Sequence, residues 1–452
     1  MGCMQSLGAT VFRLGTILLA CAVVLGPPIS SSAVTITVDF AVQEAPITHR
    51  ANGYLVSLEP DSPASELIEP LRPTSFRGNA GYVLRNYERL RRMGVDEFQL
   101  TLGLIFGELA NSIFDINRIG KNDDYGPWIA HVHKIVDQVE ERNLSVMWDI
   151  YNEPDLANVP IGNNNRLKRG WELAYRIIKE RLPGAVIVGP SVAYYANLRP
   201  FLEWSRNEQV FPDVVAYHEY GDPAGAPAYL HDIRAFLSMN GLPRPISVNE
   251  ILGQDHWMLP GYTAGVLATY ERAGIQSAIR TCWPEAQDTS RLQRENNCDN
   301  PTLDGLLYVD RQSKRPGWHI YKTYADMQGY RVSAVADSPR VHVLASADTT
   351  KGTALLMMGK FEEPAGDEVR LLLRNLSRAP FLASSAGLRL YGERIPDVGS
   401  APLEVLPVTL DTCVPVKDDQ AQVTITEFAR MDAYRVVIGS CDATQEPDSA
   451  RP

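Results

Sequence analysis

Two stretches of the sequence run from an apolar, strand-like segment into a glutamate. Residues 145–154 read SVMWDIYNEP and contain Glu153, and residues 245–250 read PISVNE and end at Glu250. If both segments are parallel strands of one barrel, their carboxyl-terminal ends present both carboxyl groups to one cleft. Two carboxyl groups in different protonation states can break a glycosidic bond, one as acid and base and the other as nucleophile.

Five further polar or aromatic residues fall at the ends of predicted strands whose interiors are apolar. They are Arg77, Asn152, His218, Tyr220 and Trp283. Polar side chains are costly in a core and useful in a site, so their convergence favours a functional cleft. Each residue taken alone also has an ordinary structural explanation, as an ion-pair partner, a buried histidine or a packed aromatic ring. Asp149, which precedes Glu153 on the same predicted strand, is a candidate for a supporting role.

The elements that must position these residues are apolar runs that alternate with helical patterns. The runs cover residues 54–58, 74–78, 97–106, 145–151, 185–190, 214–220, 245–250 and 277–283. Such alternation predicts a parallel sheet with crossover helices. Eight units over roughly 280 residues match an α/β fold, the (β/α)8 TIM barrel. An open doubly wound sheet is the alternative, but no GxGxxG or GxxxxGK[ST] motif follows any run to mark a phosphate site.

The predicted barrel occupies residues 46–329, and a different pattern begins after it. Residues 330–443 contain short alternating strands separated by turn residues, which predicts a C-terminal β-sandwich domain. Residues 34–45 begin with the β-branched run VTITVDFAV and should form a strand that joins the sandwich, because a lone strand before the barrel has no other partner. The polar tail, residues 444–452, is expected to be disordered.

Residues 1–33 have the order of a secretory signal peptide: a basic residue, an apolar core and a small-residue end. The apolar core is shorter than the ~20 residues that a membrane span needs. We therefore expect a secreted or periplasmic protein without a stable membrane span after processing. An uncleaved anchor is the alternative. A lipid anchor through Cys21 ranks second to cleavage, because the apolar run continues beyond that cysteine.

Four cysteines remain outside the signal segment: Cys282, Cys298, Cys413 and Cys441. An even number in a secreted chain predicts two disulfides, and pairing of sequence neighbours is the simplest of three connectivities. Metal binding is the rival interpretation, but no CxxC or HxxxH spacing supports it. The sequence therefore predicts neither a metal nor a cofactor.

The overall charge narrows the classes of partner. The chain carries 43 Lys and Arg against 54 Asp and Glu, a formal net charge of -11, and no block of basic residues. Nucleic-acid binding needs a concentrated positive surface, so we expect no nucleic-acid partner. The segment Gly189-Pro190-Ser191 lacks the GxSxG elbow of serine hydrolases, which disfavours that class. Nothing in the sequence indicates an oligomeric state.

Several motifs resemble one enzyme family. The Asn-Glu-Pro after the fourth run, the His-x-Tyr of YHEY, the Val-Asn-Glu of the seventh run and the final Trp of RTCW resemble clan A retaining glycoside hydrolases. The chain looks most like glycoside hydrolase family 39, which includes β-xylosidases and bacterial exopolysaccharide glycosidases. Residues 303–307 and 314–318 resemble the end of that family's barrel, and an accessory β-sandwich is expected there. The resemblance covers roughly residues 50–329 and departs from the family at Tyr151, where many members have Trp.

The resemblance implies that Glu153 is the general acid and base, that Glu250 is the nucleophile and that the substrate is a poly- or oligosaccharide. Arg77 near Glu250 would favour the ionised nucleophile, and that negative charge would raise the pKa of Glu153 and keep it protonated. Asn152 would hydrogen-bond the sugar 2-hydroxyl.

The remaining three residues have expected roles in the same cleft. Tyr220 could hold Glu250, His218 could orient Glu153 or a sugar hydroxyl, and Trp283 offers an apolar face for a pyranose ring. The competing hypothesis is a carbohydrate-binding protein that kept the barrel but lost turnover.

Overall fold

The computed structural model describes residues 33–104, 113–157, 161–283, 297–298, 300–361, 367–382 and 384–442. The predicted signal peptide, apart from residue 33, and the predicted disordered tail lie outside these residues. No helix in the described part of the chain combines the length and apolarity needed to cross a membrane.

Eight parallel strands close into a barrel, which confirms the predicted TIM barrel. In order they are β2 (Gly53–Tyr54), β3 (Ser75–Asn79), β4 (Glu97–Leu104), β6 (Met147–Asn152), β7 (Val186–Val192), β8 (Val214–Glu219), β9 (Ile246–Ile251) and β10 (Ser277–Arg280). Each strand pairs with its successor, and β10 pairs with β2 to close the sheet. A short strand, β5 (Phe114–Asp115), adds to β4. The first predicted strand is the least accurate, because only its first residue lies in β2.

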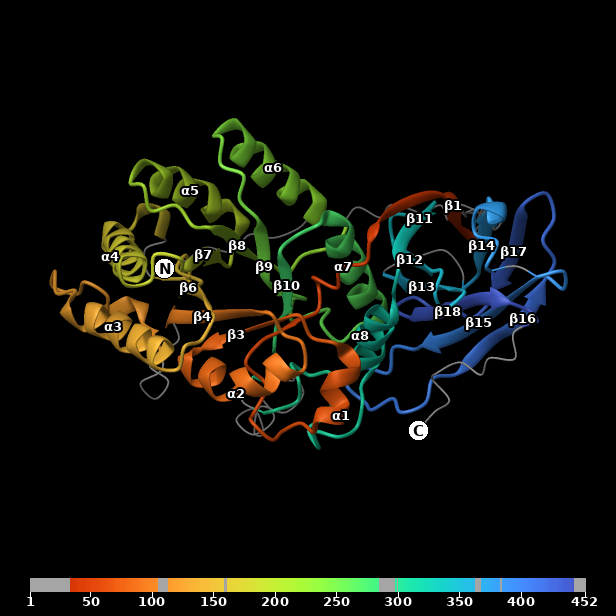
Figure 1. Ribbon diagram of the computed structural model, residues 1–452, viewed down its shortest axis with the longest axis horizontal. Coiled ribbons are helices and arrows are strands. Elements are labelled where there is room, and N and C mark those ends of the chain that lie inside the picture. The colour runs from red at the N-terminus through yellow and green to blue at the C-terminus, as the bar shows by residue number, and fades with distance from the viewer. Residues whose placement is uncertain are drawn as a thin grey trace, which may run out of the picture. The chain divides into compact units, whose positions relative to one another are not determined.

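Helices surround the barrel strands, as Figure 1 shows for α2 to α6. The helices are α1 (Ser65–Ile68), α2 (Ala80–Arg92), α3 (Gly126–Glu141), α4 (Asn165–Arg181), α5 (Leu198–Asn207), α6 (Ala226–Met239), α7 (Pro260–Ala273) and α8 (Pro316–Asp326). Short 3-10 helices are η1 (Glu69–Leu71), η2 (Ile116–Arg118), η3 (Ile161–Asn163), η4 (Tyr195–Asn197) and η5 (Leu376–Arg378). Trp128 and Trp171 are buried in this layer and donate their indole N–H groups to backbone carbonyls at 2.9 and 3.0 Å. Large aromatic rings with satisfied donors therefore fill the space between helices and strands.

The second sheet has nine strands in the order β16-β15-β18-β13-β12-β11-β1-β14-β17. Its strands are β1 (Val34–Pro46), β11 (Tyr330–Ala336), β12 (Val341–Asp348), β13 (Thr353–Lys360), β14 (Val369–Arg374), β15 (Leu388–Ile395), β16 (Val408–Val414), β17 (Gln420–Ile425) and β18 (Ala433–Ser440). The end strands β16 and β17 also contact each other, so the sheet folds over an apolar core and forms the predicted sandwich-like domain. Strand β16 begins at Val408, directly after Pro407, which has no N–H to donate to a neighbouring strand.

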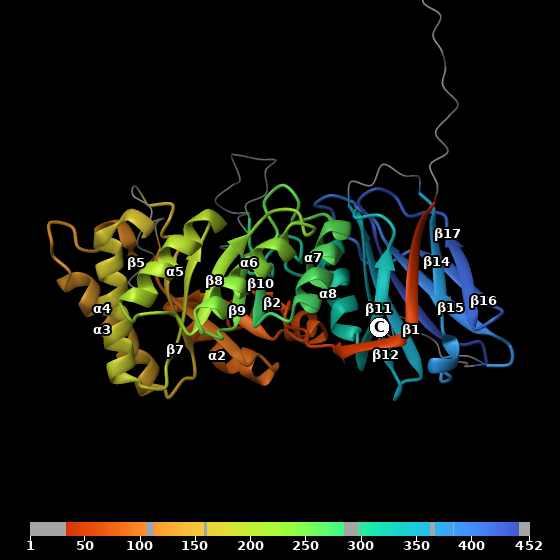
Figure 2. The same ribbon diagram turned by 90° about the horizontal axis from the view of Figure 1, so that it is seen from above.

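The N-terminal strand β1 lies inside the second sheet, between β11 and β14 (Figure 2). It runs parallel to β14 and antiparallel to β11. Val34, Ile36 and Val38 alternate into the core of this domain. The first described strand of the chain is thus held by residues that follow it by about three hundred positions.

The sandwich-like domain packs on helix α7 of the barrel through a close backbone approach. The N–H of Gly261 donates to the carbonyl of Met431 at 2.8 Å. A Cβ atom on Gly261 would lie 2.0 Å from the carbonyl oxygen of Lys360, which no side chain can tolerate. Only glycine at position 261 therefore lets helix α7 approach the backbone of the sandwich-like domain this closely.

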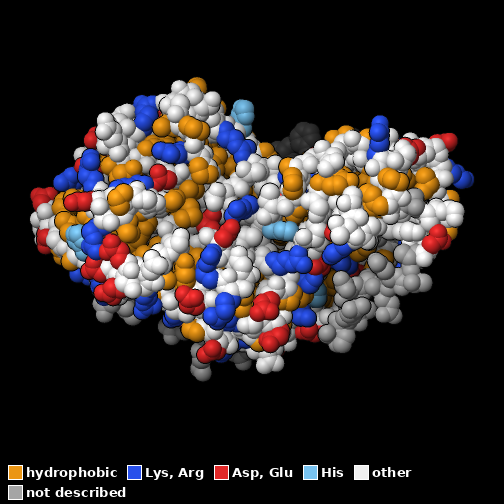
Figure 3. Space-filling model, in the orientation of Figure 1, with side chains coloured by type: hydrophobic (Ala, Val, Ile, Leu, Met, Phe, Trp, Pro, Cys, Tyr) orange, Lys and Arg blue, Asp and Glu red, His pale blue; other side chains and the backbone are white. Residues whose placement is uncertain are grey.

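Two disulfides are present, as predicted, and they have the simplest of the three possible connectivities, in which sequence neighbours pair. Cys282, after the end of β10, bonds to Cys298, and Cys413 in β16 bonds to Cys441. On the face drawn in Figure 3, basic and acidic side chains are interspersed over the surface. That distribution agrees with the mixed composition, and the expected lack of a nucleic-acid partner stays a prediction.

Candidate active site

Glu153 and Glu250 face each other at the carboxyl-terminal ends of the barrel strands. One carboxylate oxygen from each, together with a ring nitrogen of His218, lie within 4.8 Å of one another. Both glutamates are buried, each with 8% of its surface exposed. Two buried carboxyl groups this close repel each other when both are ionised, so neighbouring groups must compensate the charge.

The chain positions Glu153 by an unusual backbone turn. Glu153 follows the last residue of β6 and has a φ of +50°, in the left-handed region that non-glycine residues rarely adopt. Its N–H donates to the carbonyl of Ser191 at 2.9 Å, and its own carbonyl accepts the N–H of Leu156 at 3.0 Å. These two bonds and Pro154 hold the turn that takes Glu153 out of the sheet.

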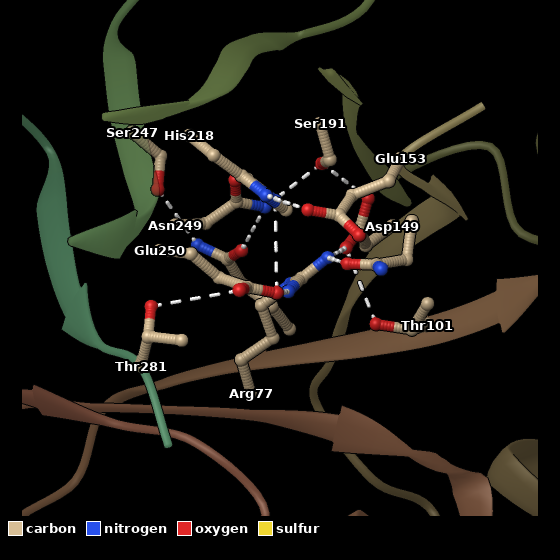
Figure 4. Close-up of polar contacts among 12 residues, drawn as sticks. Arg77, Thr101, Asp149, Glu153, Ser191, His218, Ser247, Asn249, Glu250 and Thr281 are labelled. Atoms are coloured by element: carbon tan, nitrogen blue, oxygen red, sulfur yellow. Dashed lines mark hydrogen bonds and ion pairs between the residues drawn. The ribbon is translucent and has the colours of Figure 1, made fainter. Parts of the chain in front are cut away.

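Histidine 218, on β8, lies between the two glutamates. Its Nδ1 atom is 3.1 Å from Oε1 of Glu153, and its Nε2 atom is 3.7 Å from Oε1 of Glu250. The same strand pairs with β9 so that His218 lies opposite Glu250 in the ladder. Figure 4 shows the imidazole directed toward the Glu153 carboxylate, and the orienting role of His218 stays a prediction.

Tyrosine 220 contacts both glutamates from the segment after β8. Its hydroxyl donates to Oε2 of Glu250 at 2.7 Å and lies 3.2 Å from Oε1 of Glu153. Burial, followed by the charges of Glu250 and Glu153, raises the pKa of Tyr220 well above its ordinary value. The phenol therefore keeps its proton and acts as a hydrogen-bond donor.

Arginine 77, on β3, is completely enclosed and bridges three acceptors. It contacts Oε1 of Glu250 at 2.7 Å, Oδ1 of Asn152 at 2.7 Å and Oδ2 of Asp149 at 2.8 Å. Burial alone would lower the pKa of Arg77, but the charges of Asp149 and Glu250 outweigh burial and raise it. The guanidinium thus remains charged beneath the site and fixes the side chains around it.

The surroundings of Glu250 favour its ionised form. Burial raises the pKa of Glu250, but His218, Arg77 and the hydrogen bond from Tyr220 together lower it below the ordinary value. Thr281 adds a weaker contact at 3.5 Å to Oε2. A carboxylate held in this way is available as a nucleophile at pH values where an ordinary glutamate begins to protonate.

Tryptophan 283 forms a wall beside Tyr220. Its indole N–H donates to the carbonyl of Leu252 at 2.8 Å, and the two rings meet edge to face at 5.4 Å. The Cys282–Cys298 disulfide lies next to it, and Asn297 donates to the Trp283 carbonyl at 2.9 Å. All seven predicted site residues are therefore brought together at one end of the barrel.

Several polar residues below the glutamates were not assigned to the site from the sequence. They are Thr101, Ser191, Asn249 and Thr281. Thr101 and Ser191 donate to Asp149, Asn249 donates to Ser191, and Thr281 contacts Glu250. Each lies at or near the carboxyl-terminal end of a barrel strand, where its burial gives no hint of function. Polar residues two apart inside an apolar strand, such as Gln99 and Thr101, are the signal that could have indicated a polar barrel interior.

Glu153, His218 and Glu250 also have the donor types of a metal site. Arg77 already places a positive charge 2.7 Å from Glu250, which disfavours a divalent cation at the same carboxylate. The expectation of no metal stays a prediction.

The sequence was compared with protein-family models and with curated proteins. No protein-family model matches the sequence. A 3-O-alpha-D-galactosyl-alpha-L-arabinofuranosidase from Bifidobacterium longum subsp. longum is 23% identical over 290 residues, which cover 61% of this chain and 24% of that protein. The matched region therefore spans about a quarter of the length of this curated relative.

Solved structures share the fold over nearly the whole described chain. The structure of N2152 from Neocallimastix frontalis has a TM-score of 0.75 at 21% identity and covers 90% of this chain and 100% of that chain. A GH39 β-xylosidase from Caulobacter crescentus has a TM-score of 0.62 at 13% identity and covers 90% of this chain and 99% of that chain. The resemblance noted in the sequence thus holds for the architecture, and the chain has the barrel-and-sandwich fold of solved family 39 glycoside hydrolases.

Proposed function

We propose that the protein is a retaining glycoside hydrolase that cleaves β-linked glycosidic bonds of a poly- or oligosaccharide. The observation that carries the proposal is the pair of buried carboxylates, Glu153 and Glu250, with oxygens within 4.8 Å of each other. Retaining enzymes need carboxyl groups about 5 Å apart, whereas inverting enzymes leave about 6.5–9.5 Å for a water molecule. The spacing therefore supports direct attack by one carboxylate.

In the first step, the carboxylate of Glu250 attacks the anomeric carbon and forms a new C–O bond. Glu153 donates its proton to the glycosidic oxygen as the bond to the leaving group breaks. In the second step, Glu153 removes a proton from water, the water oxygen attacks the anomeric carbon and Glu250 leaves. One water molecule is consumed and the anomeric configuration is retained.

The surrounding residues have roles that follow from their contacts. Arg77 and Tyr220 stabilise the ionised Glu250 before attack. The Oδ1 atom of Asn152 accepts from Arg77, so its amide N–H group is the one that can donate to the sugar 2-hydroxyl. That bond strengthens as charge develops on the sugar ring in the transition state. Trp283 supplies an apolar surface at the edge of the site.

The comparisons support a carbohydrate substrate without naming the sugar. The curated relative is an arabinofuranosidase, and the solved structures with the same fold include β-xylosidases. The two disulfides are compatible with the proposed secreted or periplasmic location, and a lipid anchor at Cys21 is the alternative. The competing function is carbohydrate binding without turnover. It is less well supported, because the two glutamates that turnover needs lie close together.

Hydrolysis assays decide between these two functions. The purified protein is tested on 4-nitrophenyl β-D-xyloside, β-D-glucoside, β-D-mannoside and α-L-arabinofuranoside, with Glu250→Gln as the matched inactive control. We expect turnover of at least one substrate by the wild type only. NMR of the first product then reports its anomeric configuration. Oligosaccharide binding without turnover would establish the alternative, and an inverted first product would overturn the proposed roles of Glu153 and Glu250.

A further inference from the structure

Ser191 connects the two glutamates although it touches neither side chain. It lies on β7, a strand that supplies none of the predicted site residues, and it is completely buried. Its carbonyl accepts the N–H of Glu153 at 2.9 Å. Its hydroxyl donates to Oδ1 of Asp149 at 2.7 Å and accepts from Nδ2 of Asn249 at 2.8 Å (Figure 4).

Asp149 and Asn249, the two partners of the Ser191 hydroxyl, are each connected to Glu250, the proposed nucleophile. Nε of Arg77 donates to Oδ2 of Asp149 at 2.8 Å, and Nη1 of the same guanidinium donates to Oε1 of Glu250 at 2.7 Å. Asn249 is the residue directly before Glu250 on β9. The Ser191 hydroxyl thus supports Glu250 by two routes, through the side chain of Arg77 and through the backbone of β9, while its carbonyl supports Glu153.

The backbone at Ser191 is itself constrained. Its φ is +54°, in the left-handed region, and Glu153, directly after the neighbouring strand β6, has a φ of +50°. A non-glycine residue adopts this conformation only where the surroundings hold it. The bond between the Glu153 N–H and the Ser191 carbonyl joins these two unusual positions.

We propose that Ser191 is a positioning residue that fixes the separation of Glu153 and Glu250 through Asp149, Arg77 and Asn249. The inference rests on the proposed glycosidase function. Three strands, β6, β7 and β9, converge on this one hydroxyl and its carbonyl, and a hydroxyl can both donate to Asp149 and accept from Asn249. Alanine at this position keeps the Cβ atom and the backbone, so it removes only the hydroxyl and leaves both partners without their bond.

The test compares Ser191→Ala with Ser247→Ala. Ser247 is an equally buried serine on β9. Its hydroxyl contacts Gln99 at 3.0 Å and Ser277 at 2.8 Å, and these contacts include neither Asp149, Asn249, Arg77 nor a glutamate of the site. Both variants lose a buried hydroxyl, so similar decreases in Tm are expected. With the 4-nitrophenyl glycoside that the wild type hydrolyses, we expect Ser191→Ala to lower kcat about tenfold with less than about a twofold change in KM. Ser247→Ala should keep kcat within about twofold.

A third variant separates positioning from general loss of packing. Ser191→Cys keeps a side chain of similar shape with a weak donor, so it should retain more activity than Ser191→Ala. Equal kcat values for Ser191→Ala and the wild type would overturn the inference, as would equal losses in Ser191→Ala and Ser247→Ala. A wild-type protein that hydrolyses none of the substrates would instead refute the proposed function on which the inference rests.

Discussion

The phenol oxygen of Tyr220 lies 2.7 Å from Oε2 of Glu250, and this contact is one of the causes that lower the pKa of Glu250. The proposed nucleophile must be ionised, so kcat/KM should fall as the pH decreases through that pKa. Tyr220→Phe removes the donor, and the pKa of Glu250 should rise. We expect the acidic limb of the pH profile to move to higher pH and kcat to fall about tenfold or more.

The pH profile of kcat/KM from acidic to neutral pH measures this shift. Tyr434→Phe is a suitable control, because that buried phenol lies in the sandwich-like domain and donates to the backbone carbonyl of Glu427 at 3.0 Å. An unchanged acidic limb in Tyr220→Phe would show that its hydroxyl does not stabilise the ionised nucleophile.

The roles of the two glutamates can be separated by rescue with azide. Glu250→Ala and Glu153→Ala should each lower kcat by about a thousandfold or more on a substrate with a poor leaving group. In Glu250→Ala, azide takes the place of the nucleophile and should give a glycosyl azide of inverted configuration. In Glu153→Ala, azide attacks the covalent intermediate and should give the retained configuration. NMR of the azide product assigns each role, and exchanged configurations would reverse the assignment.

Asp304 should make stability depend on pH. It is buried, its Oδ2 accepts the N–H of Leu55 at 2.6 Å, and burial raises the pKa of Asp304 to about 7. The folded state therefore binds more protons than the unfolded state between the ordinary pKa of about 4 and the raised value. Stability should decrease as the pH rises through this interval and then level off.

Asp304→Asn keeps an oxygen that can accept from Leu55 and removes the titration. The difference in Tm between wild type and variant should therefore grow in favour of the variant from about pH 4 to about pH 7. Thermal melts across this range measure the difference. Parallel curves for the two proteins would contradict the raised pKa.

The disulfide between Cys282 and Cys298 should matter for both stability and substrate binding. Replacing both cysteines by serine should cost about 3 kcal/mol of unfolding free energy, because the unfolded chain gains the freedom of the opened loop. Trp283 follows Cys282 directly, so its indole should lose its fixed position and KM should rise several-fold.

The matched control is Cys413→Ser with Cys441→Ser, in the sandwich-like domain. That pair should lower the unfolding free energy by a similar amount without a change in KM. Denaturant unfolding and steady-state kinetics on both double variants test the prediction. If KM is unchanged in the variant that lacks Cys282 and Cys298, the disulfide does not contribute to substrate binding.

Activity should not depend on a divalent cation. Arg77 supplies the positive charge at Glu250 that a metal would otherwise provide. Dialysis against EDTA should therefore leave kcat/KM unchanged, and added zinc should not raise it. A loss of activity that a metal salt restores would identify Glu153, His218 and Glu250 as metal ligands.

The sequence was sufficient to predict the barrel, the sandwich-like domain and the presence of two disulfides, and to place a set of polar residues at the strand ends, whereas the connectivity of the disulfides stayed open among three possibilities. Hydrophobic runs that alternate with helical patterns determine a closed parallel sheet, and all strands of such a sheet end on one face. Polar residues at several of those ends therefore had to meet, however far apart they are in the chain. This is why Glu153 and Glu250 could be paired before any distance was known.

The supporting contacts depended on tertiary structure. In the sequence, Ser191 follows a proline, and the segment around it could be used only to argue against a serine hydrolase, because the GxSxG motif is missing. Its left-handed backbone and its bonds to Asp149 on β6 and Asn249 on β9 arise from the register of the consecutive strands β6 to β9. That register includes irregular pairing between β7 and β8 and between β8 and β9. A shift of one residue would turn each side chain to the opposite face of the sheet, so side-chain type alone cannot indicate which polar groups meet inside the barrel.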